Sequence, residues 1–146
     1  MEMDQAIGEA LKLNEAVGQR GLQAAYSGLE DAVRIFQEEG YPIESIVPGG
    51  QSGGLGFSLK SITGSKFFEV YAKLIRRSLC TKDGEFNKLI KSGLSSSVGA
   101  VLMAIVTALG VPQIALGVMI PIAVILANTG LETFCAISEG AEKDGS

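Results

Sequence analysis

Paired carboxylates are the first side chains in this sequence that could do chemistry. Glu30–Asp31 and Glu38–Glu39 each place two acidic residues side by side, and acid–base catalysis needs two such groups that converge on one atom. Adjacent residues on a helix point more than a quarter turn apart, so neither pair converges. We therefore expect both pairs to lie on a solvent-facing side of a helix.

The residue types that most often act as a base or a metal ligand are scarce. The chain has no histidine and only two cysteines, Cys80 and Cys135. Without histidine there is no serine–histidine or cysteine–histidine nucleophile pair, and two isolated cysteines among scattered carboxylates do not form a zinc site. We therefore predict no catalytic residue, no metal and no cofactor, and a protein that is not an enzyme.

The two cysteines have no motif around them. Cys80 ends a predicted helix, and Cys135 follows the long apolar region. Because free cysteines are commonly buried, small apolar packing residues are the simplest interpretation. A disulfide between them stays open, since spacing alone does not reveal one. The acidic N-terminus lacks the apolar core of a secretory signal, so we expect a reducing cytoplasm.

A cluster of glycines at positions 49–56 could in principle bind phosphate. A phosphate loop needs glycine directly before its Lys-Ser pair, but Leu59 stands there before Lys60–Ser61. Leu59 also replaces the third glycine of a dinucleotide-binding fingerprint. We therefore interpret residues 41–65 as a Gly/Pro-rich connector, with a short strand through the alternating residues 55–59 as the alternative.

Charge is distributed unevenly along the chain, although its total is only −4. Residues 1–44 contain nine acidic and three basic residues, whereas residues 60–91 contain eight basic and three acidic ones. The aromatic residues beside this basic block, such as Phe67 and Tyr71, fall on the apolar face of a predicted helix. A nucleic-acid platform would interleave its aromatic rings with basic side chains. We therefore expect no nucleic-acid partner.

The N-terminal part of the chain is predicted to form two amphipathic helices. Apolar residues recur at intervals of three and four over 4–20 and again over 22–39, where Gly40 and Pro42 end the second helix. Each helix alone would be marginally stable, so we expect an antiparallel hairpin that buries both apolar stripes. This acidic hairpin, residues 1–40, is a candidate site for a protein partner.

A third amphipathic helix is expected from about Lys66 to Leu79, with Ser65 as its N-cap. A turn at 81–84 and a further helical stretch from Glu85 lead into the apolar region. Basic residues stand directly before that region, as they do on the cytoplasmic side of membrane segments. These membrane-flanking candidates are Arg76, Arg77, Lys82, Lys88 and Lys91.

No charged residue occurs between positions 92 and 131. Pro112 argues against one continuous helix, because proline removes a backbone donor and clashes with the preceding turn. Each half of this stretch has roughly 16 helical residues, or roughly 24 Å, marginally short of the core of a bilayer. The prediction is a hydrophobic hairpin with a first arm over 94–109, a bend at Gly110 and Pro112, and a second arm over 114–128 that Pro121 kinks.

Small residues recur every four positions along the first arm, and a shorter series lies on the second. Such spacing lets two helix backbones approach closely, in membranes and in ordinary helical bundles alike. The bulkier residues of the first arm would face lipid or core. The predicted helix-packing stripe consists of Ser96, Ala100, Ala104, Ala108, Ala123 and Ala127.

Together these segments predict one compact all-α domain. Its parts are an amphipathic N-terminal helical hairpin that is acidic (1–40), a Gly/Pro-rich connector (41–65), a basic amphipathic helical segment (66–91), a C-terminal hydrophobic helical hairpin (92–131) and an acidic tail (132–146).

This layout is similar, in outline, to the membrane-inserting domains of bacterial pore-forming toxins. The uncharged stretch and its basic flank favour a non-enzymatic protein whose hairpin engages membrane lipid, and which self-associates as a homo-oligomeric pore-forming effector or anchor. We expect it at the cytoplasmic face of a membrane, or in the cytoplasm with conditional membrane association. The alternative is a soluble all-α interaction or assembly module, with the hairpin as buried core or oligomer interface.

Overall fold

The computed structural model describes residues 1–41 and 63–136, and every regular element within these ranges is helical. The predicted all-α class is therefore confirmed. The glycine cluster at 49–56 and the tail beyond residue 136 lie outside the described residues. The elements are α1 (Met3–Arg20), α2 (Gln23–Glu38), α3 (Gly64–Leu79), α4 (Glu85–Lys91), α5 (Val98–Leu109), the 3-10 turn η4 (Gln113–Ala115), α6 (Leu116–Thr129) and a C-terminal helical segment at 131–136.

α1 and α2 are the two amphipathic helices predicted for the acidic N-terminal part. α1 ends just before Gly21, whose φ of 89° is a backbone conformation that favours glycine. Its neighbour α2 contacts α1, α3 and α6. The buried residues of α2 recur at intervals of four, four and three, which is the spacing of one helix face. They are Ala25, Leu29, Val33 and Phe36.

α3 begins earlier than the sequence pattern indicated. Thr63, and not Ser65, is its N-cap, because the Thr63 side-chain oxygen accepts a hydrogen bond from the backbone N–H of Lys66 at 3.1 Å. The buried face of the helix includes Phe67 and Tyr71, each 1% exposed. α3 therefore turns its aromatic side toward the interior and its basic side outward.

The predicted first arm, 94–109, is shorter than expected because the chain breaks between α4 and α5. Gly93 follows α4 with a φ of 75°, as a helix-ending glycine commonly does. Ser97 then caps α5, and its hydroxyl accepts a hydrogen bond from the backbone N–H of Ala100 at 3.4 Å. The two caps make α4 and α5 separate helices.

The chain turns between α5 and α6 at Gly110 and Pro112. Gly110 ends α5 in the left-handed conformation, with a φ of 63°. Pro112 precedes η4, which leads into α6. Pro121 lies inside α6, and its nitrogen has no hydrogen to donate, so the carbonyl oxygen of Gly117 receives no helical bond from it. α6 continues past this missing bond to Thr129.

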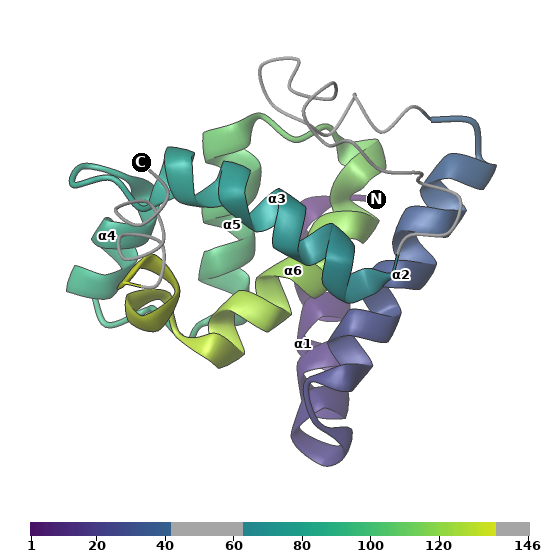
Figure 1. The fold of residues 1–146 in the computed structure, drawn as a ribbon, viewed down its shortest axis with the longest axis horizontal. Helices are drawn as coiled ribbons and strands as arrows, with labels where there is room; N and C mark the ends of the chain where they lie inside the picture. Colours follow the sequence, from purple (N-terminus) through teal and green to yellow (C-terminus); the bar gives the residue numbers. More distant parts are fainter. Residues whose placement is uncertain (42–62, 137–146) are drawn as a thin grey trace.

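α6 forms the centre of the fold. Every residue from Val118 to Ala127 is buried, and the helix contacts α1, α2 and α5. In Figure 1, α6 crosses the middle of the molecule, with α1 and α2 on one side and α5 on the other. A helix that is apolar on all sides is stable when it is enclosed on all sides. The apolar stripes of its neighbours enclose it here.

α3 begins against α2 at a position where only glycine fits. Gly64 is buried, and a Cβ atom there would collide with the carbonyl oxygen of Tyr26 on α2 and would lie 3.3 Å from the backbone nitrogen of Glu30. Backbone atoms cannot rotate away as a side chain can. Any larger residue would therefore force α2 and α3 apart.

Gly64→Ala is expected to lower the free energy of unfolding by about 2–3 kcal/mol, measured by urea denaturation followed by circular dichroism. The matched control is Gly8→Ala, since Gly8 lies inside α1 and an added Cβ would meet nothing within 4 Å. Alanine at position 8 should raise stability by about 0.5–1 kcal/mol. Equal urea midpoints for the two variants would contradict the close approach of α2 to α3.

Tyr71 makes stability depend on pH under alkaline conditions. Its side chain is 1% exposed, and burial raises the pKa of its phenol well above the ordinary value. The folded protein therefore keeps this proton at pH values at which the unfolded chain has lost it. The contribution is complete below the unfolded pKa of about 10 and is lost as the pH rises toward the folded pKa.

Tyr71→Phe should accordingly reduce the loss of stability between about pH 9 and about pH 11. The measurement is the urea midpoint at each pH for both proteins, compared as a difference so that the remaining titrating groups cancel. An alkaline slope in Tyr71→Phe equal to that of the wild type would show that the buried phenol is not its source.

Candidate interaction surfaces

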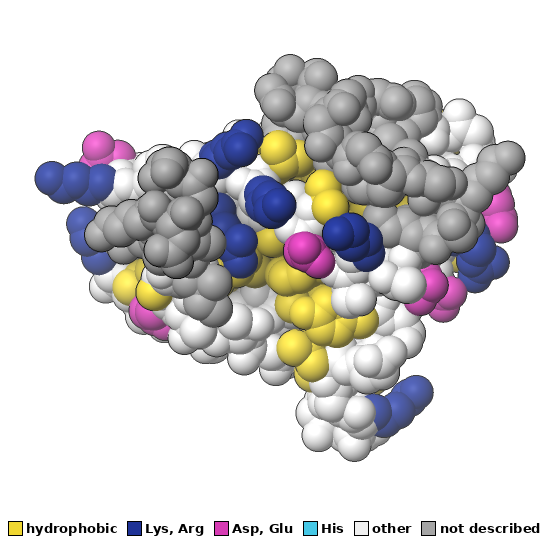
Figure 2. Space-filling view, in the orientation of Figure 1, with side chains coloured by type: hydrophobic (Ala, Val, Ile, Leu, Met, Phe, Trp, Pro, Cys, Tyr) yellow, Lys and Arg dark blue, Asp and Glu magenta, His cyan; other side chains and the backbone are white. Residues whose placement is uncertain are grey.

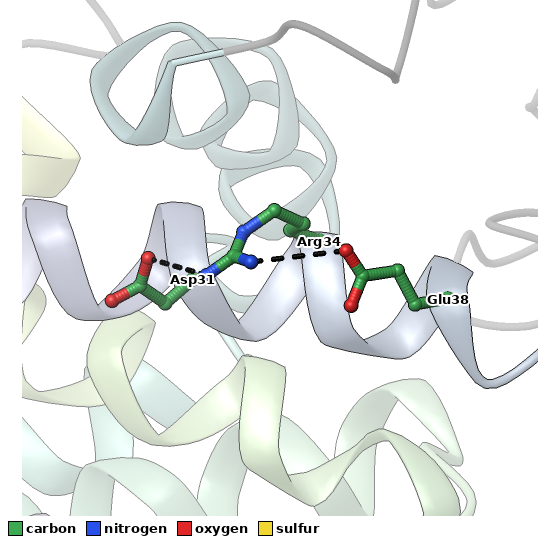
Figure 3. Close-up of polar contacts among 3 residues, drawn as sticks. All are labelled: Asp31, Arg34 and Glu38. Carbon is green, nitrogen blue, oxygen red and sulfur yellow. Dashed lines mark hydrogen bonds and ion pairs between the residues drawn. The ribbon is translucent and has the colours of Figure 1, made fainter.

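The paired carboxylates lie in solvent, on α2 and at its C-cap. Glu30, Asp31, Glu38 and Glu39 are all exposed, as predicted. Figure 3 shows the Arg34 guanidinium between two of them along α2, 3.1 Å from the Asp31 carboxylate and 3.7 Å from that of Glu38. Exposed pairs of this kind contribute about 0.3–0.5 kcal/mol each. In residues 1–41 and 63–136, no group of three or more His, Cys, Asp or Glu could hold a metal ion.

The outer sides of α1 and α2 are acidic. Residues 1–41 contain eight acidic and three basic residues. Two large apolar side chains lie among them in solvent, Leu11 at 51% and Ile35 at 46% exposure. We refer to this region as the acidic surface, and its exposed carboxylates are those of Glu2, Asp4, Glu9, Glu15, Glu30, Asp31, Glu38 and Glu39.

An apolar cleft of about 390 Å³ lies between the end of α2 and the start of α6. Ile35 and Phe36 line it from α2, and Ile114 and Val118 line it from η4 and α6. Glu39 is the one charged residue of its lining in the described part of the chain. Helical periodicity could not find this cleft, because its walls come from segments far apart in the sequence. The half-exposed Ile35 on an otherwise polar helix side was the available signal.

The predicted small-residue stripe is divided between the interior and the surface. Ser96 stands before the N-cap of α5, so it is not part of that helix. The fully buried side chains of α5 include the bulkier Leu102 and Ile105. The bulky side of the first arm therefore faces the core. Of the stripe, Ala104, Ala123 and Ala127 are buried, Ala100 is half-buried, and Ser96 and Ala108 are exposed.

Basic side chains gather on α3 and α4. Lys66, Lys73 and Arg77 occupy positions i, i+7 and i+11 of α3, which share one face of a helix, and all three are exposed. Figure 2 shows Lys and Arg side chains over α3 and on the α4 side of the molecule. The predicted flanking residues Arg77, Lys82, Lys88 and Lys91 are exposed, and Arg76 is half-buried.

Arg76 differs from the other basic residues because it packs on an aromatic ring. Its guanidinium carbon lies 4.7 Å from the centre of the Phe134 ring, within the range of a cation–π interaction. Its Nε atom is buried and has no hydrogen-bond partner within the described ranges. Arg76 thus helps to hold the C-terminal helical segment.

Cys80 and Cys135 form a disulfide bond. The interpretation of both as free, apolar packing residues is therefore wrong. The bond joins the C-cap of α3 to the C-terminal helical segment. The two Cα atoms are 5.5 Å apart, although the two cysteines are 55 positions apart in the sequence. Residues this far apart meet only through the fold, so their spacing could not predict the pair.

The comparisons with known proteins give no family for this chain. No protein-family model, no curated protein and no solved structure matches it. Among the helices of the described ranges, none combines the length and the apolar character needed to cross a membrane.

Proposed function

We propose that this chain is a non-enzymatic helical protein that acts by binding another protein, with the hydrophobic hairpin as the core of its fold. The observation that supports this function is the enclosure of α6, in which residues 118–127 are all buried beneath α1, α2 and α5. Burial in a protein core is one of the two environments that favour a helix apolar on every side. Burial of the hairpin explains why residues 92–131 carry no charge, and this explanation requires no contact with lipid.

The acidic surface of α1 and α2 is the proposed binding site. Its carboxylates are exposed, and Leu11 and Ile35 add apolar contact area among them. Protein interfaces combine apolar contacts with a polar rim, and complementary charge speeds the encounter of the two partners. The expected partner is therefore a protein with a basic surface.

A second candidate function is conditional engagement of a membrane, in which α5 and α6 leave the core and self-associate in lipid. The exposed basic residues of α3 and α4, with Leu94 exposed at 43% after α4, favour it. Anionic lipid attracts each such basic residue by about 1 kcal/mol. An interfacial helix must, however, turn its apolar side to lipid. In α3 that side holds the buried Phe67 and Tyr71, so this route requires the fold to open.

Vesicle binding of the full chain separates the two functions. The protein is first sized without detergent by size-exclusion chromatography with light scattering. It is then mixed with dye-filled vesicles that contain phosphatidylserine. We expect a discrete species that neither floats with the vesicles nor releases the dye. Release of the dye by the full chain would overturn the protein-binding function in favour of membrane engagement.

The binding site itself is tested with an immobilised lysine-rich peptide and two variants of equal net charge. Glu9→Lys with Asp31→Lys changes the acidic surface, whereas Glu69→Lys with Glu85→Lys makes the same change on the basic side. We expect retention of the first variant to fall at least about tenfold, and that of the second to fall much less. Equal losses for both would mean that only net charge matters, and would exclude the acidic surface as a specific site.

A further inference from the structure

The Cys80–Cys135 disulfide borders a cleft and is not enclosed in the core. Both cysteines are half-buried, and both line a cleft of about 240 Å³ together with Asn87, Glu132 and Ala136. A disulfide sealed in a core reacts only after the fold opens, whereas an accessible one exchanges directly with a thiolate. The position of this bond is therefore that of a reactive disulfide.

The C-terminal helical segment, residues 131–136, has few other attachments. Its Leu131 and Phe134 side chains are 0% and 3% exposed. The Phe134 ring meets the ring of Phe86 edge-on, with 6.2 Å between the ring centres, and lies under the Arg76 guanidinium. No ion pair of the described residues includes this segment. Among the described residues, the segment is thus held by two buried side chains, one of them in contact with Arg76, and by one covalent bond.

We propose that Cys80–Cys135 is a reversible thiol–disulfide exchange site: the oxidised pair holds the C-terminal helical segment on α3, and reduction by a thiol releases that segment and exposes the apolar side chains beneath it. This inference goes beyond the proposed binding function and does not depend on it.

The exchange has two steps. A thiolate RS⁻ attacks one cysteine sulfur, the S–S bond breaks, and the other cysteine leaves as a thiolate, which gives a mixed disulfide. A second thiolate attacks the mixed disulfide and releases RSSR and the remaining cysteine thiolate. The cysteine pair gains two electrons, and the two thiols lose two. Each cysteine thiolate takes up one of the two protons that the thiols gave up.

The release is expected to be local. Gly130, with a φ of 91°, ends α6 and separates it from the C-terminal helical segment. The contacts of α6 with α1, α2 and α5 do not involve this segment, so we expect them to persist when it leaves. A short element with two buried side chains opens at much lower free energy than the core. Its departure would uncover Phe86, now 0% exposed, beside the positive charge of Arg76.

Reduction of the oxidised full chain under native conditions tests this inference. The protein is incubated with increasing dithiothreitol, quenched with an alkylating agent, and the labelled cysteines are counted by mass spectrometry. The reduction rate should rise in proportion to thiol concentration over at least about a hundredfold range. A rate that levels off at the independently measured rate of global unfolding would overturn the inference, because the disulfide would then react only in unfolded molecules.

Hydrogen exchange shows what reduction releases. In the reduced protein, the amides of residues 131–136 should exchange at nearly the rate of an unfolded chain, while the amides of α6 stay protected at least about a hundredfold. Oxidised glutathione should restore the protection. Unchanged protection at 131–136, or loss of protection in α6 together with it, would each contradict a local release. The control is Cys80→Ala with Cys135→Ala. Its amide exchange rates should equal those of the reduced protein and should not change when thiol is added.

Discussion

Ile122→Asp is expected to remove at least about 5 kcal/mol of unfolding free energy, which is as much as many natural domains possess in total. Ile122 is 0% exposed and lies in the middle of α6. The substitution removes a buried aliphatic side chain, which costs about 2–5 kcal/mol by itself. It also places a carboxyl group among residues 118–127, which are all buried and apolar, and an unpaired buried charge costs several kcal/mol more. Urea denaturation and circular dichroism at neutral pH measure the result.

Met103→Asp is the matched control for this prediction. Both residues belong to the hydrophobic hairpin, but the Met103 side chain on α5 is 49% exposed. An aspartate there keeps its hydration and costs only helix propensity and some apolar contact, so the change in unfolding free energy should stay within about 1 kcal/mol. The large difference between the two variants follows from burial alone, since the introduced residue is the same.

The pair of variants also tests where the hairpin lies. If the folded protein keeps α6 in its core, Ile122→Asp unfolds the whole domain, including α1 and α2, because those helices lose the surface on which they pack. If α6 lay outside the domain, α1 to α3 would keep their helical signal and a cooperative transition. An Ile122→Asp protein with the wild-type urea midpoint would therefore refute the central position of α6.

The sequence predicted the N-terminal helices well because each of them is half buried. A helix at the edge of a core has one apolar side. The spacing of Leu29, Val33 and Phe36, at steps of four and three, indicates such a side. The same spacing predicts which face of α3 points inward, namely the face of Phe67, Tyr71 and Ile75. Periodicity is informative for these helices because water on one side and protein on the other impose it.

The same method could not place α6. A helix buried on every side has no periodic pattern, because no side of it meets water. The sequence of α6 is therefore compatible with a protein core and with lipid alike. For this reason, the sequence alone leaves a membrane-engaging hairpin as a hypothesis. Whether α6 lies in a protein core or in lipid depends on how many other helices can pack their apolar sides against it. That number depends on how α1, α2 and α5 are arranged in space.

The break between α4 and α5 has clear local signals in the sequence. Gly93 after a lysine-bearing last turn is a typical helix end, and Ser97 before an apolar run is a typical N-cap. The absence of charge over 92–131 favours starting the first arm at residue 94, before these local signals for a helix end and a new N-cap. The start of α3 is ambiguous in the sequence because Thr63 and Ser65 are both good caps, and in the structure the Thr63 side-chain oxygen accepts the hydrogen bond from the backbone N–H of Lys66.

The sequence alone could not predict sites formed by residues that are far apart in the chain. Ile35 and Ile114 line one cleft although Ile35 belongs to α2 and Ile114 to η4, far away in the sequence. Cys80 and Cys135 likewise meet only because α3 and the C-terminal helical segment are neighbours. The predictions made from absent residue types, such as histidine, did not depend on the fold. Sites assembled by tertiary contact need the structure.

Removal of the disulfide through Cys80→Ala with Cys135→Ala is expected to lower the unfolding free energy by about 4 kcal/mol. The bond spans 55 positions of sequence, and the chain-entropy model gives about 3 kcal/mol for a 15-residue loop and about 4.7 kcal/mol for a 100-residue loop. Most of this stabilisation comes from the unfolded state, which the bond prevents from expanding. The folded variant should therefore keep the helical signal of α1 to α6 at 25 °C while unfolding at much lower urea.

The urea slope tells whether the unfolded state is the source of the effect. An unfolded chain without the bond is more expanded and exposes more surface, so the m-value of the double variant should exceed that of the oxidised wild type. If the loss came only from native contacts at the C-terminal helical segment, the midpoint would fall with the m-value unchanged. Wild type measured in excess dithiothreitol should coincide with the double variant in midpoint and slope. A double variant within about 1 kcal/mol of the oxidised protein would contradict the entropy estimate, and would leave the disulfide as a local attachment of residues 131–136 without a global effect on stability.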